Sequence, residues 1–188
     1  VMLGNLHPLV QLSVLDQLSV KPKLVVLDTM NFWMDCALED LKRVMKRVDV
    51  ITINDEEARQ LSGEYSLVKA AKKIHEMGPQ FVVIKKGEHG ALLFNNEQIF
   101  FAPALPLEEV FDPTGAGDTF AGGFIGYLAH INEVNFENMK NGIIFGSNLA
   151  SFCVEKFGTK RMEKLTYQEV IARLQIFKTL TDYNIVIK

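Results

Sequence analysis

Leu24-Val25-Val26-Leu27 is the first of three short apolar runs in this sequence, and Val50-Ile51-Thr52-Ile53 and Phe81-Val82-Val83-Ile84 follow it. Each run has the length and the residue types of a strand that is buried on both faces. The intervening segments have helical periodicity, which predicts helices over residues 33–48, 56–61 and 66–77. Strands and helices that alternate in this order predict right-handed βαβ units, and therefore an α/β fold with a mainly parallel sheet.

The pattern changes after the third run. Residues 91–94 and 98–102 have the pattern of two strands joined by a tight turn, so we expect an antiparallel hairpin at the edge of the sheet. Thr166 and Glu169 have the spacing of a capping box at the start of a late helix. Helices are predicted in this last part of the chain over residues 118–130, 137–156 and 167–180.

Length and composition indicate one soluble domain that spans residues 1–188. Of these residues, 48% are hydrophobic and 23% are charged, which is ordinary for a globular protein. The net charge of −3 is spread along the chain, so no basic stripe predicts binding to nucleic acid. The longest nearly apolar run, residues 120–129, is about half the length that a membrane helix needs, and Val1 begins no export signal. We therefore expect a cytoplasmic protein that does not enter a membrane.

The cysteines and histidines indicate no metal site. Cys36 and Cys153 lack the spacing of a zinc site or a disulfide framework, and both lie in helical patterns. We expect reduced thiols that pack as small buried hydrophobic side chains rather than as reactive groups. Phe32 and Trp33 fall at apolar-periodic positions and are expected in the core. The histidines have no ligand spacing and lie at His7, His75, His89 and His130.

Residues 112–118 have the sequence Asp-Pro-Thr-Gly-Ala-Gly-Asp and precede a predicted helix. Gly115, Ala116 and Gly117 have almost no side chain, so their backbone N–H groups can approach an anion where the helix dipole adds positive potential. A carboxylate beside that position repels an anion, unless its role is to accept a proton from an attacking nucleophile. The structural alternative is that Asp118 complements the positive end of the helix, while the glycines allow close packing.

Together with Thr119-Phe120-Ala121-Gly122-Gly123-Phe124, this segment resembles the carboxy-terminal signature of the ribokinase-like, or PfkB, family of carbohydrate kinases. The resemblance implies a three-layer α/β/α fold. It also implies that the amides of residues 115–117 form an anion hole for the transferring phosphoryl group. Asp118 would then be the catalytic base, and Thr114 would belong to the nucleotide site.

Asn54-Asp55-Glu56-Glu57 resembles the NxxE motif of the same family. By this resemblance, Asn54 and Glu57 help to hold Mg²⁺ and the phosphates, largely through water. The two residues also fit a helix start in which Asn54 is the N-cap and Glu57 reciprocates three positions later. The two roles are compatible, because a cap fixes both side chains in place.

Lys85-Lys86-Gly87-Glu88-His89-Gly90 follows the third apolar run and is similar to the family's loop that lines the nucleotide site. Lys85 and Lys86 point to opposite faces of a strand, so one of them is expected to reach phosphate. The resemblance assigns this contact to Lys85 and places Gly87 and Gly90 in the nucleotide site. The alternative is that the glycines only form the turn that opens the hairpin.

Two further segments hold candidate residues whose alternatives stay open. Asn148 lies in a helical segment that the resemblance places near the adenine, where it would contact the base or the ribose. An ordinary packed helix face is the alternative for Asn148. Asp28 and Asn31 follow the first apolar run, at the edge where ligands bind in open α/β sheets. They either face that site or form a turn whose hydrogen bonds are satisfied.

The resemblance implies an ATP- and Mg²⁺-dependent kinase that phosphorylates a hydroxyl group of a sugar or sugar-like small molecule. It allows activation by a monovalent cation held by backbone carbonyls, and a homodimer of the intact protein formed through lid strands. The sequence lacks the family's amino-terminal sugar-binding and lid segments, so it resembles the carboxy-terminal portion of a longer kinase. The sugar itself cannot be named, because selectivity in this family resides largely in those segments.

Two other functions fit part of the sequence. A non-catalytic nucleotide-binding or regulatory domain would keep the fold and the phosphate cradle, whereas the presence of Asp118 favours a kinase. A dinucleotide-binding oxidoreductase needs a G-x-G-x-x-G turn after its first strand and an acidic residue about 20 positions later, and the sequence has no such pattern. Titration with ATP and Mg²⁺, compared with NAD(H), separates the oxidoreductase from the other two.

Overall fold

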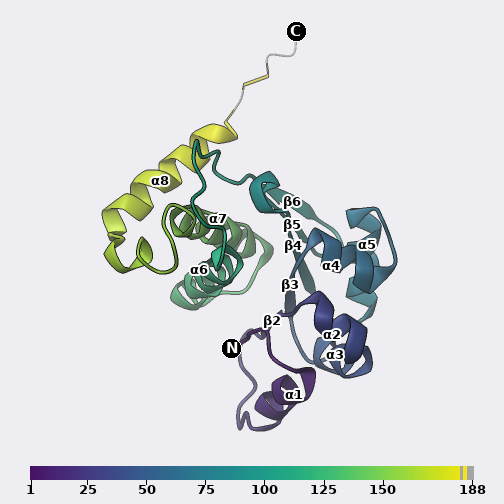
Figure 1. Ribbon diagram of the computed structural model, residues 1–188. Helices are drawn as coiled ribbons and strands as arrows, with labels where there is room; N and C mark the ends of the chain where they lie inside the picture. Colours follow the sequence, from purple (N-terminus) through teal and green to yellow (C-terminus); the bar gives the residue numbers. More distant parts are fainter. Residues whose placement is uncertain (183, 186–188) are drawn as a thin grey trace. The chain divides into compact units, whose positions relative to one another are not determined.

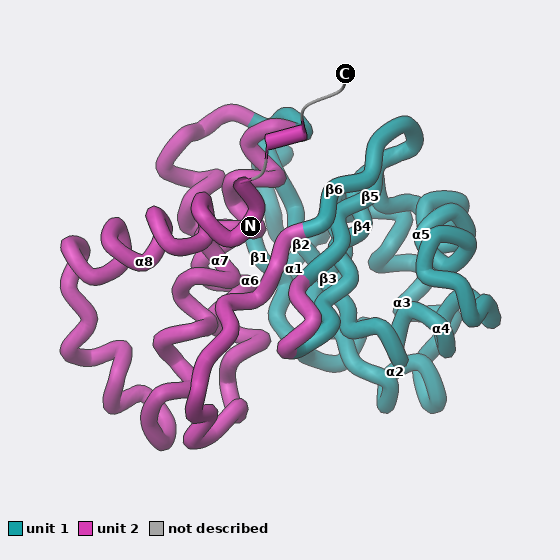
Figure 2. Tube along the Cα trace, turned by 90° about the horizontal axis from the view of Figure 1, so that it is seen from above, with its two compact units in different colours: residues 1–87, 91–101, 134–136 teal, residues 88–90, 102–133, 137–188 magenta. Residues whose placement is uncertain are grey.

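The computed structural model describes residues 1–182 and 184–185 (Figure 1). The chain forms two compact units, which Figure 2 shows in different colours. Unit 1 contains the sheet, and unit 2 contains the helical carboxy-terminal part of the chain. Unit 1 comprises residues 1–87, 91–101 and 134–136, and unit 2 comprises residues 88–90, 102–133 and 137–188.

The described strands form one sheet in the order β1-β2-β3-β4-β5-β6. Their bounds are β1 (Met2–Leu3), β2 (Val26–Asp28), β3 (Val50–Asn54), β4 (Phe81–Lys85), β5 (Ala91–Phe94) and β6 (Ile99–Ala102). β1 to β4 pair in parallel, and β5 pairs antiparallel with β4. Asp28 lies opposite Thr52, and Asn54 lies opposite Lys85. The mainly parallel sheet with an antiparallel edge confirms the predicted α/β fold, and its register gathers polar residues at the carboxyl ends of β2, β3 and β4.

The helices of unit 1 supply most of the apolar side chains that pack with the sheet. Their bounds are α1 (Pro8–Asp16), α2 (Asn31–Cys36), α3 (Leu38–Met45), α4 (Asp55–Ser62) and α5 (Leu67–Glu76). A 3₁₀ turn, η1 (Gly87–His89), follows β4. The core residues with no exposed surface include Leu41, Val44, Met45, Ile51 and Ile74. The three predicted strands and the predicted helices over 56–61 and 66–77 are therefore present in unit 1, with ends that differ by one or two residues.

The predicted helix over residues 33–48 is wrong as a single element. It is divided into α2 and α3 at Ala37, whose φ of −145° and ψ of 33° are not helical. The sequence contains no proline or glycine at this break, so apolar periodicity alone predicted a continuous helix. β1 and α1 were not predicted. β1 has two residues, which is too short for a periodic pattern.

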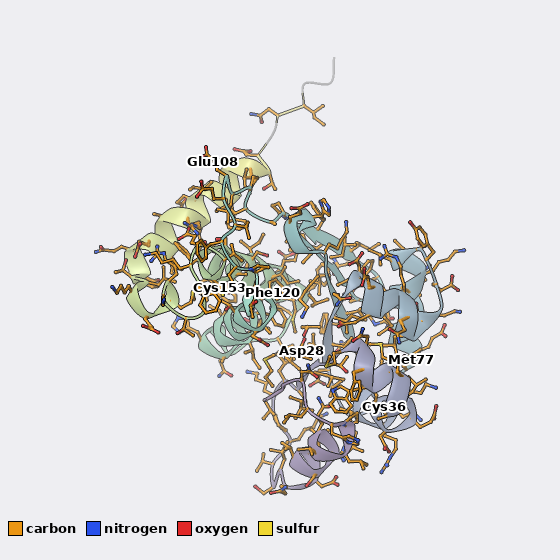
Figure 3. All side chains as sticks on the ribbon, in the orientation of Figure 1. Asp28, Cys36, Met77, Glu108, Phe120 and Cys153 are labelled. Carbon is orange, nitrogen blue, oxygen red and sulfur yellow. The ribbon has the colours of Figure 1, made fainter. Side chains whose placement is uncertain are left out.

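The predicted burial of Phe32 and Cys36 is also wrong. Phe32 is 53% exposed, and Cys36 is exposed as well (Figure 3). The reason is the length of α2, because this helix has six residues and buries only Met34. Cys153, in contrast, is buried as predicted.

The long helices of unit 2 confirm the predicted helical end of the chain. They are α6 (Ala116–Ile131), α7 (Phe136–Cys153) and α8 (Tyr167–Leu180), with a 3₁₀ turn, η2 (Met162–Lys164), before α8. Thr166 and Glu169 form the predicted capping box of α8. No helix within residues 1–182 and 184–185 is both long and apolar enough to span a membrane.

Helices α6 and α7 approach each other at glycines. A Cβ atom added to Gly146 of α7 would lie 2.6 Å from the carbonyl oxygen of Phe120 in α6. A Cβ atom added to Gly123 of α6 would lie 3.0 Å from the Cα atom of Gly146. Real Cβ atoms do not approach other atoms as closely as 2.6 Å, so the two backbones require glycine at position 146, whereas a Cβ at position 123 would fit only if its neighbours moved by a few tenths of an ångström.

Candidate functional site

The carboxyl ends of β2, β3 and β4 carry a polar cluster within unit 1. The Asp28 carboxylate at the end of β2 is buried (Figure 3), and its Oδ1 atom accepts two hydrogen bonds. The Thr52 hydroxyl donates one over 2.9 Å, and the Lys85 Nζ atom donates the other over 3.1 Å. Asp28 therefore neutralises the charge of Lys85 through a partly buried ion pair.

The two alternatives for Asp28 and Asn31 are resolved differently for each residue. Asp28 lies at the carboxyl edge of the sheet and contacts side chains of the next two strands, β3 and β4. Asn31 instead accepts a hydrogen bond from the backbone N–H of Phe32 at the start of α2, over 2.9 Å. Asn31 thus has the local hydrogen bond of the turn alternative, whereas Asp28 belongs to the polar cluster.

Asn54 and Glu57 form a complete capping box at the start of α4. The Asn54 Oδ1 atom accepts from the Glu57 N–H over 2.7 Å, and the Glu57 Oε2 atom accepts from the Asn54 N–H over 2.8 Å. Burial raises the pKa of Glu57 above its ordinary value, although the Asn54 N–H and the Lys85 ammonium oppose the rise. The nearby charge of Asp28 raises the pKa further. The capping alternative is therefore present, and the carboxylate it holds is poorly solvated.

The capping box leaves room for a second role. Among the contacts of the described residues, none engages the Glu57 Oε1 atom or the Asn54 Nδ2 atom. A poorly solvated carboxylate with an open oxygen fits the water shell of Mg²⁺, which prefers oxygen ligands and keeps several of its waters. Within the described part of the chain, no three His, Cys, Asp or Glu side chains are grouped so that they could hold a metal ion. The site accordingly fits a hydrated ion held through water better than a directly coordinated one.

The glycines after β4 have positive φ angles, 57° at Gly87 and 84° at Gly90. A Cβ atom at Gly90 would lie 2.1 Å from the carbonyl oxygen of Ala102, whereas Gly87 has open space around it. Gly90 is therefore required by close packing, which matches the alternative of a turn that opens the hairpin. Lys86, the other lysine of this segment, is partly exposed.

The segment 112–118 forms a glycine loop at the N-terminus of α6 in unit 2. Gly115 is the N-cap residue and has a left-handed conformation with φ 80°, which glycine adopts without strain. The Ala116 N–H donates to the Pro113 carbonyl over 3.1 Å. Among the described contacts, none engages the N–H groups of Gly117 and Asp118, and both residues are exposed. Among the described contacts, none engages the Gly115 N–H either, so the open amides are those of Gly115, Gly117 and Asp118, whereas the Ala116 amide is occupied.

Two neighbours hold the start of this loop. The Asp112 Oδ1 atom accepts from the Thr114 N–H over 3.0 Å. This bond, followed by one from the Thr114 side chain and one from the Gly158 N–H, lowers the pKa of Asp112. The Cys153 thiol lies 3.8 Å from the Thr114 carbonyl oxygen and is the nearest atom to the position of a Cβ on Gly115, at 4.0 Å. Cys153 therefore packs beneath the loop.

Asn148 has no exposed surface. Its Nδ2 atom donates to the Val170 carbonyl over 2.9 Å, which links α7 to α8. The Oδ1 atom is buried and has no partner among the described residues. This geometry matches the alternative of a packed helix face.

The candidate residues thus form two groups, each within one unit. Asp28, Asn54, Glu57 and Lys85 gather in unit 1, while residues 112–118 lie in unit 2. The sequence pattern did not predict the contacts of Thr52 and Cys153. Thr52 had a signal, because it is the polar residue of an otherwise apolar run, but Cys153 had none.

Residues 11–165 match the model of the pfkB family carbohydrate kinases. The chain belongs to this family. It spans about half the length, or less, of the relatives that follow.

Three relatives show the extent of the similarity. A cytidine kinase of Thermococcus kodakarensis is 41% identical over 87 residues, which are 45% of this chain and 31% of that protein. The crystal structure of ribokinase from Thermotoga maritima matches 93% of this chain and 56% of its own, with 27% identity and a TM-score of 0.73. Aminoimidazole riboside kinase from Salmonella enterica, solved with aminoimidazole riboside and an ATP analog, matches 80% of this chain and 52% of its own, with 26% identity and a TM-score of 0.70. These structures confirm the predicted ribokinase-like fold.

Proposed function

We propose that this chain carries the phosphoryl-transfer machinery of a kinase that uses ATP and Mg²⁺ to phosphorylate a hydroxyl group of a sugar or nucleoside. The observation that carries the proposal is the glycine loop 112–118, which presents open amides and the exposed Asp118 carboxylate at the N-terminus of α6. Membership of the pfkB family and the ATP analog in the related riboside kinase support ATP as the donor.

Asp118 would act as the proton acceptor. When the acceptor hydroxyl attacks the terminal phosphorus, its proton passes to the carboxylate, a new O–P bond forms, and the bond to the leaving ADP oxygen breaks. Charge on the transferring phosphoryl group is stabilised by the open N–H groups at the start of α6, together with the positive end of the helix. The exposed carboxylate and the amides beside it therefore have complementary roles in one step.

Asn54 and Glu57 would hold Mg²⁺ through its water shell. When bound, Mg²⁺ neutralises and orients the phosphates. The capping box fixes both side chains, so they remain in place whether or not the ion is bound. Lys85 would contact the tail phosphates, and its pairing with Asp28 holds the ammonium at the edge of the sheet until phosphate oxygens are present.

The test compares Asp118→Asn with Glu137→Gln. Glu137 is an exposed carboxylate in the first turn of α7, so this variant also removes a charge near a helix N-terminus. We expect Asp118→Asn to bind ATP as well as the wild type or slightly better, because the repulsive charge is gone. Turnover should fall by about 10²- to 10⁴-fold, the usual scale for losing a general base. Glu137→Gln should change neither quantity.

The measurements, made on the full-length protein, are ATP titration with Mg²⁺ and phosphorylation assays with sugars and nucleosides as acceptors. Undiminished turnover in Asp118→Asn would refute the assigned base. ATP binding by the wild type without phosphorylation of any acceptor would support the alternative of a non-catalytic nucleotide-binding domain.

A further inference from the structure

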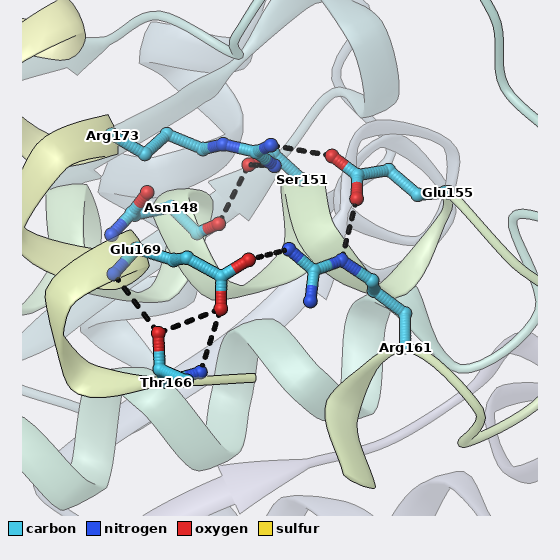
Figure 4. A network of polar contacts seen from close by, with 7 residues as sticks. All are labelled: Asn148, Ser151, Glu155, Arg161, Thr166, Glu169 and Arg173. Atoms are coloured by element: carbon cyan, nitrogen blue, oxygen red, sulfur yellow. Dashed lines mark hydrogen bonds and ion pairs between the residues drawn. The ribbon is translucent and has the colours of Figure 1, made fainter. Parts of the chain in front are cut away.

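The end of α7 and the residues after it hold a charged network within unit 2 (Figure 4). Glu155 accepts hydrogen bonds from two arginines, from the Arg161 Nε atom over 2.8 Å and from an Arg173 Nη atom over 2.5 Å. Both arginines also contact the Phe152 ring, with guanidinium carbons 4.9 Å and 3.4 Å from its centroid. One aromatic ring and one carboxylate therefore fix two cations.

The network extends into α8. Arg161 also donates to Glu169 over 2.6 Å, and Glu169 accepts from both the N–H and the hydroxyl of Thr166. These hydrogen bonds lower the pKa of Glu169 to about 2. Arg173, which lies on α8, also donates to the Ser151 hydroxyl over 3.0 Å. The network thus ties the first half of α8 to the last turn of α7.

Two residues of the network are direct sequence neighbours of the residues that contact the glycine loop. Phe152 lies against the two arginines, and Cys153 packs beneath Thr114 and Gly115. The Val154 carbonyl accepts from the N–H groups of Phe111 and Asp112, over 2.8 Å and 3.3 Å. Glu155 is clamped by the arginines. Of these four consecutive residues, the first and last belong to the network, and the middle two contact the loop and the residue before it.

The balance of forces on Glu155 shows that the clamp is built for the charged carboxylate. Burial alone would raise the pKa of Glu155, but the hydrogen bonds from Arg161 and Arg173 outweigh it and lower the pKa. The arginine side chains are themselves 15% and 17% exposed. Removing the carboxylate charge leaves two largely buried cations with weaker partners, which is costly. The residues between Phe152 and Glu155 therefore have little freedom to move.

We propose that Glu155, clamped by Arg161 and Arg173, is a positioning residue that holds the glycine loop 112–118 through Cys153 and the Val154 carbonyl. Its effect on turnover rests on the function proposed above, whereas its effect on the loop rests on the contacts alone. Cys153 and the Val154 carbonyl form the seat of the loop. When the contacts of Glu155 with the arginines are weakened, this seat moves. The open amides and the Asp118 carboxylate then lose their positions relative to each other. Displacements of about 1 Å in such groups are known to cost about 10²-fold in rate.

Cys153 provides a direct reporter of the seat, because it is buried under the loop whereas Cys36 is exposed. In a Cys36→Ser background, a small neutral thiol reagent reacts with Cys153 only when the seat opens. We expect Glu155→Gln and Arg173→Met to increase the rate of Cys153 labelling about tenfold or more. A tenfold increase corresponds to about 1.4 kcal/mol of lost local stability. Glu163→Gln is the matched control, because Glu163 is an exposed carboxylate of the same segment that bonds only to Thr159.

The second readout separates positioning from general damage. With an acceptor that the wild type phosphorylates, Glu155→Gln should lower kcat by about 10- to 100-fold while the KM for the acceptor stays unchanged. Arg173→Lys keeps a cation at Glu155, so its kcat should fall less than the kcat of Arg173→Met. If Arg173→Met does not fold, as judged by circular dichroism, Glu155→Gln and Arg173→Lys still give both readouts.

The outcomes distinguish this inference from the proposed function. Unchanged Cys153 labelling in Glu155→Gln would overturn the inference, whatever happens to turnover. Faster labelling in Glu155→Gln with wild-type turnover would also overturn it, because the loop would then not depend on the seat. A full-length wild type that phosphorylates nothing, combined with faster labelling and weaker binding of inorganic phosphate in Glu155→Gln, would support the positioning role and refute the kinase.

Discussion

Glu57→Gln separates the capping role of Glu57 from its proposed role in holding Mg²⁺. Glutamine keeps a side-chain oxygen that can accept from the Asn54 N–H, so the capping box survives while the negative charge is lost. Asn54→Ala is the reference variant, because it removes the acceptor of the 2.7 Å bond from the Glu57 N–H. Losing this cap should cost about 1 kcal/mol of folding stability.

The raised pKa of Glu57 determines the sign of the effect on stability. Because the folded protein binds the Glu57 proton more tightly than the unfolded chain, wild-type stability is lost as pH rises through the folded-state pKa. Near pH 7 the charged Glu57 carboxylate therefore destabilises the folded state, and glutamine removes this charge. We expect Glu57→Gln to be as stable as the wild type or more stable at pH 7, and this advantage should shrink on acidification toward the unfolded-state pKa.

The assay is urea unfolding followed by the fluorescence of Trp33, the one tryptophan of the chain, at pH 7 and pH 5. In parallel, turnover is titrated with Mg²⁺. Glu57→Gln should need about 10- to 100-fold more Mg²⁺ for half-maximal turnover, because losing a residue that holds a metal indirectly typically lowers metal affinity by about that factor. A loss of stability equal to that of Asn54→Ala, with an unchanged Mg²⁺ requirement, would show that Glu57 is a cap and nothing more.

Two further predictions concern packing and nucleotide binding. Gly146→Ala should lose about 1–3 kcal/mol of stability, because its Cβ has no room against α6. Gly126→Ala has open space around its Cβ on α6 and should gain about 0.5–1 kcal/mol. Thermal melting of both variants tests this, and equal melting temperatures would contradict it. Lys85→Met should raise the KM for ATP severalfold and Lys86→Met should leave it nearly unchanged, and the reverse order in steady-state assays would show that the strand faces are assigned wrongly.

The fold and the glycine loop were predictable because their signals are local. An apolar run of four residues reports a strand, and the sequence Gly115-Ala116-Gly117-Asp118 reports a loop at a helix start. The capping box of Asn54 and Glu57 was predictable for the same reason, since both partners lie within four residues.

The remaining features depend on contacts between distant parts of the sequence. The partner of Lys85 is Asp28, 57 positions earlier, and only the register of three strands brings the two together. The Ala116 amide is occupied by a turn that residue types alone do not reveal. Asn148 is buried because α8 covers it, which no pattern within α7 indicates.

The glycine contact between α6 and α7 has a mechanical consequence for Asp118. An α-helix is stiff, and five residues separate Asp118 from Gly123, a rise of about 7.5 Å along the axis. The contact there is between main-chain atoms, so it does not relax by changing side-chain rotamers. The position of the Asp118 carboxylate therefore depends on the Gly123–Gly146 contact, which lies more than one helical turn away. A methyl group added at this contact would tilt α6 and move the carboxylate with it. Under the proposed function, the rate of phosphoryl transfer is sensitive to atoms that never touch substrate.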